Sequence, residues 1–75
     1  MNFTVLSDRD AAIINARMEF GPQPKFQQEF DSLAAATAAS TKFKMRYPGP
    51  YDSTVGIYPL PEGKYLVLGH WNAVD

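Results

Sequence analysis

The chain has 75 residues and a mass of 8.4 kDa, so it forms one small domain that buries only about 60% of its unfolded surface. Hydrophobic residues make up 45% and aromatic residues 13%, which excludes a disordered tail. Seven Lys and Arg against eight Asp and Glu give a net charge of -1, which excludes a histone-like or polybasic protein. The chain contains no cysteine, so disulfides and thiolate chemistry are excluded too.

The first part of the chain predicts two strands. Asn2 to Leu6 is short and rich in β-forming residues, and the polar cluster after it predicts a turn. Apolar and polar residues then alternate from Ile14 to Phe20, which predicts a second strand. Ser7 followed by Asp10 imitates a helix cap ahead of Ala11, so a helix is the alternative for this segment. We favour the strand, because alternation over seven residues outweighs one capping signal.

The middle of the chain predicts a strand and a helix. Lys25 to Phe30 alternates again, with two phenylalanines on one face, and predicts a hairpin with the preceding strand across the Pro-containing loop. Asp31 or Ser32 is the expected N-cap of an Ala-rich helix that runs to about Thr41. Lys42 to Tyr47 is either the last turn of this helix or an extended exit from it.

The end of the chain predicts a hairpin, with strands over Thr54 to Tyr58 and Lys64 to Trp71 around a Pro-Glu-Gly turn. Tyr65 to Leu68 is apolar on both faces and therefore predicts an interior strand. The expected fold class is α+β, with an antiparallel sheet of four or five strands packed against a single Ala-rich helix, in one compact domain over residues 1–75. Because one helix leaves a sheet face poorly covered, a homodimer and a monomer both stay open.

The sequence offers little for catalysis, and we expect that the protein is not an enzyme. His70 is the only imidazole and lies in the most apolar strand, where a structural hydrogen bond explains it better than proton transfer. Asp8 and Asp10 are spaced like two ligands of a calcium loop, but the carboxylates that would complete the loop are missing. We therefore expect no cofactor and no metal. A chain this short is also expected to struggle to form a pocket of a few hundred cubic ångströms.

Two loops instead favour binding to another protein. Tyr47 to Tyr51 and Tyr58 to Pro61 each combine tyrosine with two prolines, and aromatic side chains dominate interface hot spots. For a single tyrosine, capping the edge of a small core is the simpler explanation. We predict a module that binds a larger protein or complex, with anchors and secondary polar contacts at Tyr47, Tyr51, Tyr58, Trp71, Lys42, Lys44 and Arg46.

The alternative function is binding of single-stranded nucleic acid by Lys42, Lys44 and Arg46 with the nearby aromatic residues. No apolar run is long enough to cross a membrane and no signal peptide is recognisable, so we expect a cytoplasmic protein without a membrane partner. In size and expected architecture the chain is similar to phage-encoded inhibitors of host or defence machinery, including anti-CRISPR proteins. This analogy implies an inhibitor that occupies a surface of its partner.

Overall fold

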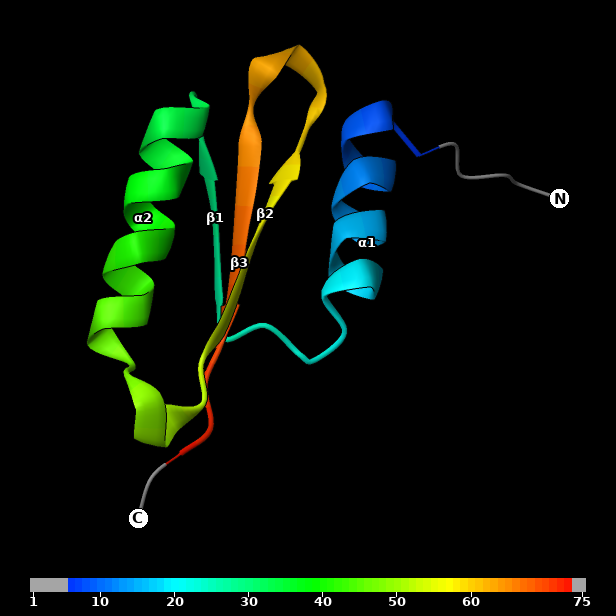
Figure 1. Cartoon of the computed structure of the whole chain (residues 1–75). Helices are drawn as coiled ribbons and strands as arrows, with labels where there is room; N and C mark the ends of the chain where they lie inside the picture. Colours follow the sequence, from blue (N-terminus) through cyan, green and yellow to red (C-terminus); the bar gives the residue numbers. More distant parts are fainter. Residues whose placement is uncertain (1–5, 74–75) are drawn as a thin grey trace, which may run out of the picture.

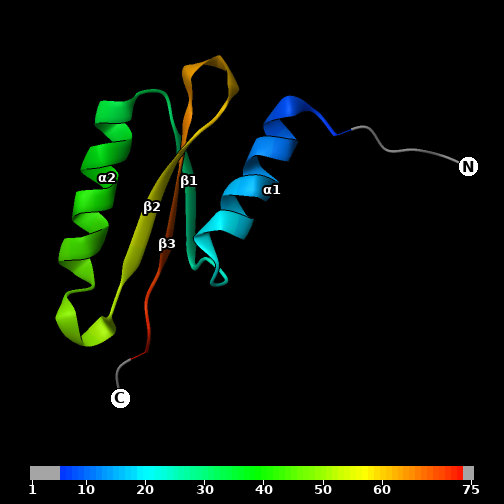
Figure 2. The same ribbon diagram turned by 45° about the vertical axis from the view of Figure 1, so that its right-hand side comes forward.

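The computed structural model describes residues 6–73, which form a three-stranded antiparallel sheet with one helix on each face (Figures 1 and 2). The elements are α1 (Asp8–Phe20), β1 (Phe26–Phe30), α2 (Leu33–Arg46), β2 (Thr54–Pro59) and β3 (Tyr65–His70), with the short 3₁₀ helices η1 (Gly49–Tyr51) and η2 (Pro61–Gly63) on either side of β2. The strand order is β1-β3-β2, so β3 is central and both its neighbours lie at an edge.

The predicted fold needs correction. The class is α+β, but the described residues form two helices and three strands, not a single helix with four or five strands. The predicted strand over Asn2 to Leu6 lies outside the described residues except for Leu6, which has no regular structure. The predicted N-terminal hairpin is wrong as well, because β1 pairs with β3.

The segment from Ile14 to Phe20 is helical, and its buried residues recur at the spacing of a helix instead of alternating as in a strand. Ala16 and Phe20 are buried and Ala12 and Ile13 pack beside them, which makes one stripe along α1. Ile14 and Met18, the other apolar members of the alternating pattern, are exposed. Ser7 caps the helix by accepting a hydrogen bond from the backbone N–H of Asp10, at 3.1 Å. Gly21, at a φ of 95°, ends it.

The remaining predicted elements are confirmed with adjusted ends. Ser32 caps α2 by accepting a hydrogen bond from the N–H of Ala35, and the helix continues to Arg46, so most of Lys42 to Tyr47 belongs to its last turns. β2 and β3 form the C-terminal hairpin, and β3 is the interior strand that its apolar sequence predicts. Neither helix is long and apolar enough to cross a membrane.

The strand register divides the core into two sides. Leu66 and Leu68 of β3 face α1 and pack with Phe20 and Leu60. Val67, between them, must point to the opposite face, where α2 lies. Gly69 lies under the ring of Phe43 from α2, and a Cβ atom at this position would come within 2.6 Å of that ring.

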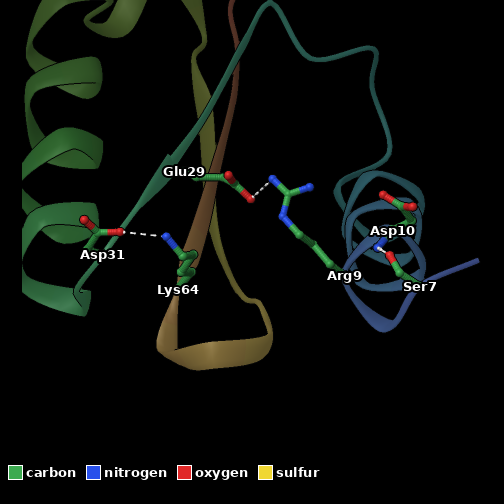
Figure 3. A network of polar contacts seen from close by, with 6 residues as sticks. All are labelled: Ser7, Arg9, Asp10, Glu29, Asp31 and Lys64. Atoms are coloured by element: carbon green, nitrogen blue, oxygen red, sulfur yellow. Dashed lines mark hydrogen bonds and ion pairs between the residues drawn. The ribbon is translucent and has the colours of Figure 1, made fainter.

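Charged side chains link these layers at the surface (Figure 3). Arg9 of α1 pairs with Glu29 on β1, and Lys64 pairs with Asp31 at 3.1 Å, between the start of β3 and the end of β1. The Lys64 pair is exposed at both ends and Arg9 is half exposed, so solvent screens both pairs and each adds little to stability. The two pairs orient the ends of elements that apolar packing already holds.

We expect Gly69→Ala to lower the free energy of unfolding by about 1 to 3 kcal/mol, because the added methyl group must displace the buried Phe43 ring. Gly49→Ala is the control, since a Cβ atom there meets nothing within 4 Å. Urea denaturation followed by circular dichroism measures both variants. Equal stability of the two would contradict the close packing of α2 on β3.

Candidate binding groove between α2 and β1

A groove of about 490 Å³ lies between α2 and the edge strand β1, and we call it the α2–β1 groove. It is lined by Lys25, Phe26, Gln28, Phe30, Ala35, Ala38, Ala39, Lys42, Phe43, Arg46, Tyr47 and Trp71. This volume falls in the range of ligand sites, so the expectation that the chain is too short for such a pocket is wrong.

Residue size and helix position create the groove. Ala36 and Phe43 are the buried residues of α2 and hold the helix against the sheet, mainly over β2 and β3. The neighbouring stripe of α2, with Ala35, Ala38 and Ala39, faces β1 instead. Because alanine side chains are short, they do not fill the space above the edge strand.

An aromatic cluster closes the end of the groove at the C-terminus of α2. Tyr47, the C-cap residue of this helix, stacks on Trp71 with centroids 4.1 Å apart and planes 7° from parallel. The ring of Phe43 lies 5.1 Å from Tyr47, 5.9 Å from Trp71 and 5.6 Å from Phe26. Tyr51 packs edge-on against Tyr47 at 5.5 Å. The tilted and edge-on contacts fall within the range of about 4.5 to 7 Å that aromatic pairs prefer, and the stack of Tyr47 on Trp71 is closer still.

The charge of the groove is of one sign. Lys25, Lys42 and Arg46 line it, and none of its twelve lining residues is acidic. Lys25 donates a hydrogen bond to the backbone carbonyl of Trp71 at 2.7 Å and lies 4.9 Å from the centre of the Trp71 ring. Neither of the two ion pairs found within residues 6–73 involves these three cations. The groove therefore combines apolar walls with a positive rim.

The structure brings together five of the seven residues predicted for binding. Tyr47, Tyr51, Trp71, Lys42 and Arg46 lie in the groove or in the aromatic cluster at its end.

The other two residues lie elsewhere. Lys44 points away from the groove and donates to the carbonyl of Ser53 at 2.5 Å. Tyr58 faces α1, where its ring covers Gly56. Burial raises the pKa of the Tyr58 hydroxyl, and the negative charge of Glu19 raises it further. Tyr58 is thus a packing residue of the opposite face.

Sequence reasoning missed eight of the twelve lining residues, among them the larger side chains of Lys25, Phe26, Phe30 and Phe43. The alternation from Lys25 to Phe30 does place both phenylalanines of that segment on one face. The alternation alone does not show that β1 is an edge strand, or that the face with the phenylalanines lies opposite α2. Extending the predicted helix to Arg46 would have indicated the other wall of the groove, because Lys42, Phe43 and Arg46 then lie on one side of that helix.

The residues considered for catalysis lie apart from the groove. His70 Nδ1 is 3.0 Å from the backbone carbonyl of Gln23, which is the structural hydrogen bond expected for it. Asp8 and Asp10 lie in the first turn of α1, where negative charge is favourable. Within residues 6–73 no three or more acidic or histidine side chains gather in a geometry that could hold a metal ion.

We expect Trp71→Leu to lower the free energy of unfolding by about 1 to 2 kcal/mol, because it removes the stack on Tyr47 and the contact with Phe43. Tyr51→Leu is the comparison, since it loses a single edge contact and should cost less. Urea denaturation followed by far-ultraviolet circular dichroism gives both values. A larger effect at Tyr51 would contradict the central position of Trp71 in the cluster.

Comparisons with protein-family models, with curated proteins and with solved structures give no match for this chain. Its function must be inferred from the geometry of the α2–β1 groove.

Proposed function

We propose that this protein is a non-enzymatic binding module that holds an apolar, acidic segment of a larger protein in the α2–β1 groove. The observation that carries this proposal is the composition of the groove, in which apolar walls, a fixed aromatic end and three cations occur without any carboxylate. Apolar side chains of a partner would gain from leaving water, and its acidic groups would meet the positive rim.

The packing of the aromatic end of the groove supports binding. Phe43 is buried and surrounded by the rings of Phe26, Tyr47 and Trp71, and the hydrogen bond from Lys25 fixes the chain after β3. A site that is already ordered loses little conformational entropy when a partner arrives. Tyr47, Tyr51 and Trp71 are anchors in this proposal, and Lys42 and Arg46 supply the polar contacts.

Inhibition follows from occupancy. A partner segment held between α2 and β1 is withdrawn from whatever it otherwise contacts. This is the mode of action that the analogy of size with phage-encoded inhibitors implies, and it requires no catalytic residue.

We expect Ala38→Glu to weaken capture of the partner by about tenfold or more, because the new side chain fills the groove and neutralises its rim through the neighbouring Lys42. Ala34→Glu is the matched control, because Ala34 is exposed on the same helix but does not line the groove. Affinity capture from nuclease-treated lysate of the native cell or host compares the two variants with the unchanged chain. Equal losses in both variants would contradict the assignment of the groove.

Single-stranded nucleic acid is the second candidate, because Lys25, Lys42 and Arg46 could neutralise phosphates beside an aromatic cluster. The structure makes this less favourable, since the stacked faces of Tyr47 and Trp71 cover each other. A nucleic-acid base could stack only on the outer faces of these two rings, where other side chains do not cover them.

For a nucleic-acid ligand we expect Arg46→Gln to reduce the affinity and Lys44→Gln to leave it nearly unchanged, because only Arg46 lines the groove. The affinity should also fall steeply with salt. Titration of a fluorescent single-stranded oligonucleotide at two salt concentrations measures both effects. Strong, salt-sensitive binding of this oligonucleotide, together with no protein captured after nuclease treatment, would replace the protein-binding proposal with this one.

A further inference from the structure

The outer edge of β1 is not covered by any element within residues 6–73. The strand order places β1 at one side of the sheet, with β3 as its only strand neighbour among those residues. Both helices lie toward the other side of the sheet: α2 packs mainly over β2 and β3, and α1 packs against β3, β2 and η2. An uncovered edge strand presents backbone N–H and C=O groups that can pair with another strand.

The residues of this edge match a second copy of themselves. When Lys25 to Asp31 is placed antiparallel to an identical segment with Gln28 opposite Gln28, Lys25 stands opposite Asp31 and Phe26 opposite Phe30. Within one copy Lys25 donates to the Trp71 carbonyl and Asp31 pairs with Lys64, so the cross-strand ion pair would exchange with these exposed contacts. Gln27 and Glu29 form the remaining polar pair. Opposite charges and aromatic pairs directly across an antiparallel ladder are stabilising. The segment also contains no proline, the residue that commonly blocks pairing at an edge.

We propose that two copies of this chain form a symmetric dimer through antiparallel pairing of their β1 strands, with the two-fold axis at Gln28. The two sheets then become one continuous sheet of six strands, three from each copy. The contact is isologous, since the same surface of each copy meets its counterpart, and such two-fold dimers are the commonest oligomers.

The positions of the helices leave room for this contact. Neighbouring strands lie about 4.8 Å apart, so a helix centred over β2 and β3 stays roughly 10 Å from the two-fold axis. The two α2 helices would then be about 20 Å apart, well beyond the 8 to 10 Å at which helices pack in contact. The dimer therefore forms without moving a helix.

The dimer would join the binding surfaces of the two copies. Phe26, Gln28 and Phe30 form the β1 side of each α2–β1 groove. In the dimer these residues lie next to their counterparts, so one continuous trough runs between the two α2 helices above the paired strands. Lys42 and Arg46 of both copies would line this trough. Dimerisation does not depend on the proposed protein ligand, because it uses backbone groups at the sheet edge.

The first test is the mass of the unchanged chain in solution, measured by sedimentation equilibrium from low to high micromolar concentration. A reversible dimer is expected, and a strict monomer at high micromolar concentration overturns the proposal and leaves the edge of β1 to a strand of a foreign partner. Capture of the partner is measured separately, so the failure of one proposal is distinguishable from the failure of the other.

The second test locates the contact by cross-linking. The chain has no cysteine, so Gln28→Cys introduces a single thiol at the two-fold axis. Directly opposed residues in an antiparallel ladder have Cα atoms about 4.5 to 5.5 Å apart, which suits a disulfide. Mild oxidation should convert this variant to a covalent dimer that reductant reverses. Asn15→Cys, on the exposed side of α1, is the matched control and should stay largely monomeric. Equal cross-linking of both variants overturns the proposal.

The third test reverses the charges of one cross-strand pair. The variants are made in a Lys64→Gln background, because Lys64 pairs with Asp31 within one copy. Lys25→Glu and Asp31→Lys each place like charges opposite one another at both ends of the contact, and each should raise the dimer dissociation constant by about tenfold. The double variant restores opposite charges and should recover most of the affinity. Circular dichroism checks that all three variants fold. Failure of the double variant to recover, with its fold intact, overturns the proposed register.

Discussion

The contact between the Phe43 ring and the bare backbone of Gly69 determines how α2 lies on the sheet. Any side chain at position 69 would meet the ring at 2.6 Å, so the helix reaches its position only because β3 carries a glycine there. With Phe43 held in place, Tyr47 follows one helical turn later and meets Trp71 just beyond the end of β3. The aromatic cluster and the end of the α2–β1 groove both depend on this contact.

The sequence predicts the elements that carry one clear periodicity and fails where two patterns overlap. β1, the C-terminal hairpin and the capped Ala-rich helix each follow a single pattern, and the structure contains all of them. In the N-terminal segment, Ile14 and Met18 imitate a strand because they fill positions between Ala16 and Phe20. Both side chains are exposed, so their apolar character does not indicate a buried face. The N-cap at Ser7 is the sequence feature that predicts this segment correctly.

The site was harder to predict than the elements because a groove depends on relative placement. The aromatic residues Tyr47 and Trp71 and the cations Lys42 and Arg46 were identified from residue type, and they lie together. Tyr58 has the same residue type and a proline beside it, yet it lies under α1. Only the strand register, which assigns alternate residues to opposite faces, separates Tyr58 from the other tyrosines. The alanines of α2 contribute little buried area, and their small size also leaves the α2–β1 groove open.

The open groove and the open edge of β1 have one physical cause. Three strands side by side are wider than one helix, and this short chain provides only one helix for each face within residues 6–73. Both helices cover β3 and β2, which make the hairpin with the most buried residues, and so neither is centred over β1. The strand that receives the least cover keeps its side chains accessible on the α2 face and its backbone accessible at the edge. A third helix or a longer α2 side chain over β1 would bury more apolar surface, but it would remove the groove and the free edge on which both proposals rest.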